Sequence, residues 1–127
     1  MLNKDVCAHS DQGPILLIDH VSIEWIKLPG QQGVPDVLTD QNFNQLRKWF
    51  DGALQYIQEE RPKRVAVWGF VTHITEYAVG SKAENPLDPG ALAALDRFLA
   101  YVDDKRIEGK IVYVTASEIA DLIVINQ

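Results

Sequence analysis

Residues 65–73, Val65-Ala66-Val67-Trp68-Gly69-Phe70-Val71-Thr72-His73, form an almost wholly apolar run that ends in a histidine. The run comes soon after the helix-breaking Pro62 and is rich in β-branched and aromatic residues. A short apolar run of this kind is typical of a strand buried on both faces, and such strands belong to parallel sheets covered by helices. The run therefore predicts an α/β fold.

Two further strands are predicted on either side of this run. Gly13-Pro14 introduces the apolar run 15–18, and alternating apolar and polar residues from His20 to Trp25 extend it with one exposed face. The third strand is predicted at residues 111–114, which read Ile-Val-Tyr-Val.

Three helices are predicted between and after these strands. Thr39 or Asp40 can cap the first, which Pro62 ends, and Asp88-Pro89 provides the cap and first-turn proline of the second. The sequence from Thr115 to Glu118 fits a capping box that opens a closing helix. The stripes expected to face the sheet are Phe43, Leu46, Phe50, Ala53, Leu54 and Ile57 in the first helix, and Leu92, Leu95, Phe98, Leu99 and Val102 in the second.

The order of the elements predicts three βα units with a parallel sheet, because crossovers between parallel strands are right-handed and place the helices outside. At 127 residues and 46% hydrophobic, the chain has the size of one domain. We expect an irregular amino-terminal segment at residues 1–13 and a single α/β domain at residues 14–127.

The charge and composition of the chain exclude several classes of partner and site. The net charge of −6 and the scattered basic residues exclude nucleic acid as the expected partner, because binding a phosphate backbone needs a basic stripe. No apolar stretch reaches the roughly 20 residues of a membrane helix, and the amino terminus lacks a signal-peptide pattern. We expect a soluble protein without a membrane partner, cytoplasmic by default. The single cysteine, Cys7, excludes an internal disulfide and a cysteine-based metal site.

Polar residues follow each predicted strand, and parallel strands would bring them to one rim. His73 and Glu76 are the candidate catalytic pair, since an imidazole and a carboxylate can act as general acid and base. The candidate ligand-binding residues are Asp19, His20, Thr72 and Thr115. No pair has a tight metal-ligand spacing, so neither a metal site nor a cofactor is predicted. The alternative is that His73 is a hydrogen-bonded structural residue and His20 an exposed strand residue.

Two roles are open for the three tryptophans, Trp25, Trp49 and Trp68. They can offer a surface for stacking sugars, or they can pack in the core or in an interface.

Three segments resemble the carboxyl-terminal part of polysaccharide deacetylases of the NodB-like type: VAVWGFVTHITEYAVG (65–80), LDPGALAALDRFLAYVDD (87–104) and GKIVYVTASEIADL (109–122). The segment ILLIDHVS (15–22) resembles one of that family's late barrel strands. The resemblance implies part of a (β/α) barrel, and it implies that His73 assists as general acid during deacetylation. The family's metal-binding Thr-Phe-Asp-Asp and His-x-x-x-His motifs do not occur in this chain.

These observations predict a deacetylase-like α/β module that is catalytically incomplete and that binds a ligand or assembles into a homo-oligomer. The oligomer is expected because a three-stranded sheet leaves two apolar edges unpaired, and a carbohydrate is the expected class of ligand. One alternative is a carbohydrate deacetylase or related hydrolase completed by oligomerisation or by a partner chain. Another is an independent α/β regulatory domain.

Overall fold

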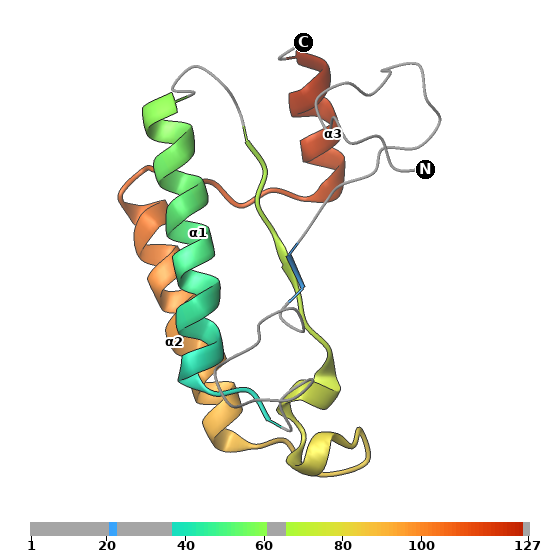
Figure 1. Ribbon diagram of the computed structural model, residues 1–127. Coiled ribbons are helices and arrows are strands. Elements are labelled where there is room, and N and C mark those ends of the chain that lie inside the picture. The colour runs from blue at the N-terminus through green and yellow to red at the C-terminus, as the bar shows by residue number, and fades with distance from the viewer. Residues whose placement is uncertain (1–20, 23–36, 61–65, 126–127) are drawn as a thin grey trace, which may run out of the picture.

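The computed structural model describes residues 21–22, 37–60 and 66–125, of which 66% are helical and 5% are in strands (Figure 1). The elements in chain order are β1 (Val21–Ser22), α1 (Asp40–Glu60), β2 (Phe70–Val71), the 3-10 helices η2 (Ile74–Tyr77) and η3 (Val79–Ser81), α2 (Pro89–Ile107) and α3 (Ala116–Ile125).

The helices α1 and α2 lie side by side and run in the same direction (Figure 1). Between them in sequence, the chain returns along the helix pair through the extended segment that contains β2. The strands β1 and β2 pair in parallel, with Val21 opposite Phe70 and Ser22 opposite Val71. Figure 1 shows α3 on the other side of this segment from α1.

Thr39 and Asn42 interact at the start of α1, and the sequence predicted a role there for Thr39 but not for Asn42. The main-chain N–H and the hydroxyl of Thr39 both donate to Oδ1 of Asn42, at 3.1 and 3.0 Å. The main-chain N–H of Leu38 donates to the carbonyl of Glu76 at 3.0 Å. The residues that lead into α1 are therefore tied to η2. Thr39 stands at the predicted cap position, but its hydroxyl donates to Asn42 and accepts no main-chain N–H of the helix among the hydrogen bonds of the described residues.

The boundaries of α2 follow directly from its sequence. Asp88 accepts a hydrogen bond from the N–H of Ala91 at 2.9 Å, and Pro89 occupies the first turn, as predicted. At the other end Gly109 has a φ of +76°, which glycine adopts without strain. The N–H of Gly109 bonds the carbonyl of Arg106 and the N–H of Lys110 bonds that of Lys105, the pattern of a Schellman motif.

The capping box predicted for α3 is confirmed. The N–H of Glu118 donates to the hydroxyl of Thr115 at 3.3 Å, and the N–H of Thr115 donates to the Glu118 carboxylate at 2.5 Å. The hydrogen bond from the Thr115 main chain lowers the pKa of Glu118.

The core lies where α1, α2 and the β2 segment meet. Phe43 stacks on Phe98 with ring centroids 5.7 Å apart, and Phe70 meets Phe98 edge to face at 5.4 Å. Trp49 and Trp68 pack against this core, which agrees with the packing alternative for both, while Trp25 lies outside the described residues. The buried members of the cluster are Leu38, Phe43, Leu46, Tyr77, Ala91, Ala94 and Phe98.

The prediction of an α/β fold with a three-stranded parallel sheet is wrong. Of the described residues 66–73, only Phe70–Val71 is a strand, and residues 111–114 form no strand with the described part of the chain. The first predicted strand lies outside the described residues except for Val21–Ser22. The run is not buried on both faces either, because Val67 and Val71 are exposed. The half-buried side chains of Trp68 and Phe70 pack against the helical core instead of inside a sheet. The partial-barrel expectation fails with the sheet.

The stripe predicted for α2 is right for Phe98, which is buried, and for Leu95 and Val102, which pack against the core. It is wrong for Leu92 and Leu99, which are exposed, and it omits the buried residues Ala91 and Ala94. Small residues at a helix contact let two helices approach closely, which explains the two buried alanines. No helix among the described residues has the length and apolar character needed to cross a bilayer.

The packing of Phe98 predicts a large cost for its removal. Phe98→Ala should lower the free energy of unfolding by about 3 to 5 kcal/mol, because the substitution removes a buried ring and leaves a cavity. Leu99→Ala is the matched control, since Leu99 lies next to it on α2 but is 44% exposed. Denaturant unfolding followed by circular dichroism measures both, and equal losses would contradict the assigned core.

Candidate functional site

Thr72, His73 and Glu76, three of the predicted site residues, lie together at the end of β2. Both the Thr72 hydroxyl and the main-chain N–H of His73 donate to Oε2 of Glu76, the second at 2.7 Å. The hydroxyls of Thr72 and Tyr77 are hydrogen-bonded at 3.0 Å. A single carboxylate thus organises the turn that leads from β2 into η2.

Glu76 is the buried acid of this cluster, at 2% exposure. Among the described residues its second oxygen, Oε1, has no hydrogen-bond partner. Tyr77 is buried beside it. Burial raises the pKa of the Tyr77 hydroxyl, and the negative charge of Glu76 adds to that effect.

This geometry gives Glu76 a capping role, because its carboxylate satisfies donors of its own loop. The side chain of His73 is exposed. The roles of His73 and Glu76 as general acid and base stay predictions.

Thr115 does not join this cluster, and two other predicted residues cannot be placed. Thr115 caps α3, which begins far from η2 in Figure 1. Asp19 and His20 lie outside the described residues. Of the predicted residues that the structure describes, those after one strand lie together, and the expected grouping of Thr115 with Thr72 is wrong.

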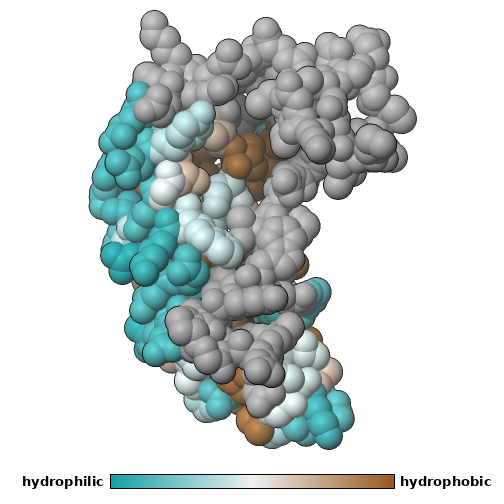
Figure 2. All heavy atoms as spheres, viewed as in Figure 1, coloured by the Kyte–Doolittle hydropathy of each residue, from teal (hydrophilic) through white to brown (hydrophobic). Residues whose placement is uncertain are grey.

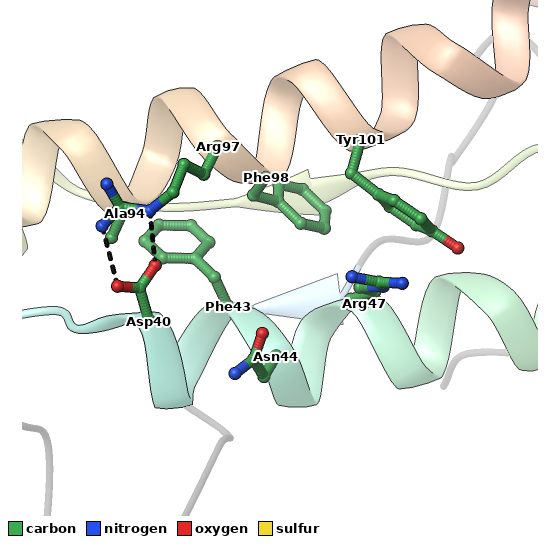
Figure 3. Close-up of a pocket in the computed structure, with 8 residues that line it drawn as sticks. All are labelled: Asp40, Phe43, Asn44, Arg47, Ala94, Arg97, Phe98 and Tyr101. Atoms are coloured by element: carbon green, nitrogen blue, oxygen red, sulfur yellow. Dashed lines mark hydrogen bonds and ion pairs between the residues drawn. The ribbon is translucent and has the colours of Figure 1, made fainter.

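A groove between α1 and α2 is the second candidate site (Figure 3). Its volume is about 170 Å³. Figure 3 shows Arg97 with Asp40 at one end and Arg47 with Tyr101 at the other, and the rings of Phe43 and Phe98 lie between them. The lining residues are Asp40, Phe43, Asn44, Arg47, Ala94, Arg97, Phe98 and Tyr101.

The two ends of this groove hold their arginines in different ways. Arg97 donates two hydrogen bonds to the Asp40 carboxylate, at 2.9 and 2.7 Å. These bonds lower the pKa of Asp40. The Arg47 guanidinium instead lies 3.8 Å from the centre of the Tyr101 ring, a cation–π contact.

Tyr101 is itself held in place. Its hydroxyl donates to the Asp51 carboxylate, and its ring meets Phe50 edge to face at 6.3 Å. Burial raises the pKa of Tyr101, and the hydrogen bond to Asp51 raises it further. These contacts hold the Tyr101 ring in one position at this end of the groove.

The groove was not anticipated from the sequence. The sequence predicts Asp40 as a possible helix cap, and no local pattern distinguishes Arg97. The two residues stand 57 positions apart, so no local spacing connects them. The one local indication was Arg47 four residues before Asp51 on the first helix, a spacing that places two side chains on one face.

Among the described residues, no three His, Cys, Asp or Glu side chains are grouped as metal ligands. No protein-family model matches the chain, and no curated protein and no solved structure is significantly similar to it. The resemblance to deacetylases therefore stays a prediction drawn from the sequence.

The capping role of Glu76 can be measured by substitution. Glu76→Ala leaves the Thr72 hydroxyl and the His73 N–H without their acceptor, so the free energy of unfolding should fall by about 1 to 3 kcal/mol. Glu84→Ala is the control, because Glu84 is an exposed acid in the next turn and should change stability by less than about 0.5 kcal/mol. A Glu76→Ala protein as stable as the control would rule out the capping role.

Proposed function

We propose that the chain is a non-catalytic binding module that assembles with a second copy of itself. The observation that supports this proposal is a group of exposed apolar residues, the 107–114 patch, made of Ile107, Val112, Tyr113 and Val114. Ile107 is 70% exposed, Val112 75% and Tyr113 59%. Large apolar residues gathered in this way mark interaction surfaces in soluble proteins.

The patch is held in one arrangement by its neighbours. The Tyr113 hydroxyl donates to the Asp103 carboxylate at 3.1 Å, and the Arg106 guanidinium lies 5.9 Å from the centre of the Tyr113 ring. These contacts fold the segment after Gly109 back toward the last turns of α2. A surface that is already ordered loses less conformational entropy on binding.

A second copy is the occupant that fits this segment. Residues 110–115 lie outside helices and strands, and β-branched residues and a tyrosine make up the segment 111–114. Within the described part of the chain, none of the main-chain groups of 111–114 bonds to another main-chain group. Two such segments related by a two-fold axis could pair with each other, since an isologous interface uses the same residues on both sides.

A second exposed apolar surface supports self-association less well. Figure 2 shows hydrophobic residues at the lower tip of the molecule, where η2 and η3 lie in Figure 1, and the exposed apolar residues of that region include Ile74 and Val79. The N–H of Val79 already bonds the carbonyl of Pro86, and Ala78 forms a bridge with Leu87. Main-chain groups of this tip are therefore already hydrogen-bonded within the chain, and fewer of them are available to pair with a second copy.

The proposed assembly predicts a homodimer that depends on the 107–114 patch. Light scattering after size exclusion at micromolar concentration should give a mass of twice 14.3 kDa for the parent chain. Val112→Glu should give the monomer mass, because it places a charge in the buried centre of the interface.

The matched control is Ile74→Glu, at a residue that is 65% exposed but outside the patch. It should leave the dimer intact. A parent chain that stays a monomer, or a dimer that Ile74→Glu disrupts and Val112→Glu does not, would contradict the proposal.

The alternative of a hydrolase completed by assembly rests on His73 and Glu76. Their geometry favours it little, because the Glu76 carboxylate already accepts two hydrogen bonds from its own loop. We expect the assembled protein to release no acetate from acetylated oligosaccharides in the presence of zinc, cobalt or manganese, as measured with a coupled acetate assay. Release that His73→Ala abolishes would instead favour the hydrolase.

A further inference from the structure

We propose that Asp103 is a positioning residue of the interface between two copies of the chain. It holds Tyr113 against α2, and it thereby determines which side of the 107–114 patch meets the second copy. This role rests on the self-association proposed above and adds to it a residue outside the patch. Three observations support it: a set of mutual contacts around the Asp103 carboxylate, a turn at Gly109, and a difference in exposure between neighbouring side chains.

Asp103, Arg106 and Tyr113 contact one another and are called here the Asp103 cluster. The Arg106 guanidinium donates to both carboxylate oxygens of Asp103, at 2.6 and 3.2 Å. The Tyr113 hydroxyl donates to Oδ1 of the same carboxylate at 3.1 Å, and Arg106 lies 5.9 Å from the centre of the Tyr113 ring. A single ion pair at a surface contributes little, but a paired guanidinium and carboxylate within a set of contacts has a defined geometry.

The turn at Gly109 returns the chain toward α2 and has contacts of its own. Gly109 has a φ of +76°. The Glu108 carboxylate pairs with Lys105 of α2 at 3.3 Å and with Lys110, beyond the turn, at 2.6 Å. These ion pairs end at Lys110. Within the described part of the chain, the hydrogen bond of the Tyr113 hydroxyl is the one that joins residues 111–114 to α2.

Neighbouring side chains of this segment differ in exposure. Val112 is 75% exposed, the highest value in the patch, and Tyr113 is 59% exposed. Because the hydroxyl of Tyr113 is bound to α2, Val112 is the side chain that a second copy meets first. Without that bond the segment is free to turn and to present Tyr113 instead. A two-fold interface uses the same residues of both copies, so each such change acts twice.

The dissociation constant of the dimer tests this role, measured by light scattering over a dilution series of the full chain. Tyr113→Phe removes the hydroxyl and keeps the ring beside Arg106, and Asp103→Ala removes the acceptor. Each should raise the dissociation constant about tenfold, the effect of losing one hydrogen bond in each of two copies. Asp104→Ala is the matched control, because it removes the same charge from the adjacent exposed position of α2 and should have no effect.

A double variant separates positioning from direct contact with the second copy. If Asp103 acts through Tyr113, the protein with both Asp103→Ala and Tyr113→Phe should dimerise no more weakly than the weaker of the two single variants. Circular dichroism verifies that each variant is folded. Additive effects of the two substitutions would overturn the proposal, and so would an Asp103→Ala protein that dimerises as tightly as the Asp104→Ala protein.

The Asp103 cluster can also be measured without a dimer, in the Val112→Glu protein. Partial loss of hydration raises the pKa of the Tyr113 hydroxyl, and the hydrogen bond to Asp103 and its negative charge raise it further. NMR titration of the Tyr113 ring should therefore show ionisation at lower pH after Asp103→Ala than after Asp104→Ala. Equal ionisation in a chain whose parent is a dimer would overturn this proposal alone, whereas a monomeric parent would overturn the proposed self-association as well.

Discussion

Phe43 and Phe98 stack across the boundary between α1 and α2, and the described part of the fold is assembled around this contact. Phe70 packs edge to face on Phe98, which places the β2 segment against the helix pair. The same two rings line the groove and lie between Arg47 and Arg97. The hydrophobic contact that stabilises the fold thus also shapes the candidate binding surface.

The helices were predictable because their ends are encoded by neighbouring residues. Thr39 before α1, Asp88-Pro89 before α2 and the Thr115–Glu118 box before α3 all act within one turn of the chain. Asp88 and the Thr115–Glu118 box accept hydrogen bonds from main-chain N–H groups at the start of their helices, and Asn42 accepts the main-chain N–H of Thr39. Local chemistry of this kind can be interpreted without knowledge of the tertiary structure.

The sheet could not be predicted in the same way, because strand pairing depends on residues far away in the sequence. The run 65–73 was recognised correctly as largely apolar, but Trp68 and Phe70 pack on helices. Residues 111–114 have the composition of a strand and yet form none with the described residues. The pairing of Asp40 with Arg97 was equally hidden, because only the packing of α1 on α2 brings them together. Of the predicted site, only the cluster around Glu76 was local enough to find.

Acidic side chains stand at the start of α1, η2, α2 and α3, although not of η3: Asp40 in the first turn of α1, Glu76 in η2, Asp88 before α2 and Glu118 in α3. The amino-terminal end of a helix carries partial positive charge, so these acids are favoured there. Part of the acidic excess is therefore neutralised within the molecule by main-chain dipoles that a count of charged residues omits. The negative potential that an approaching ligand meets is weaker near these four positions than the formal charge of −6 suggests.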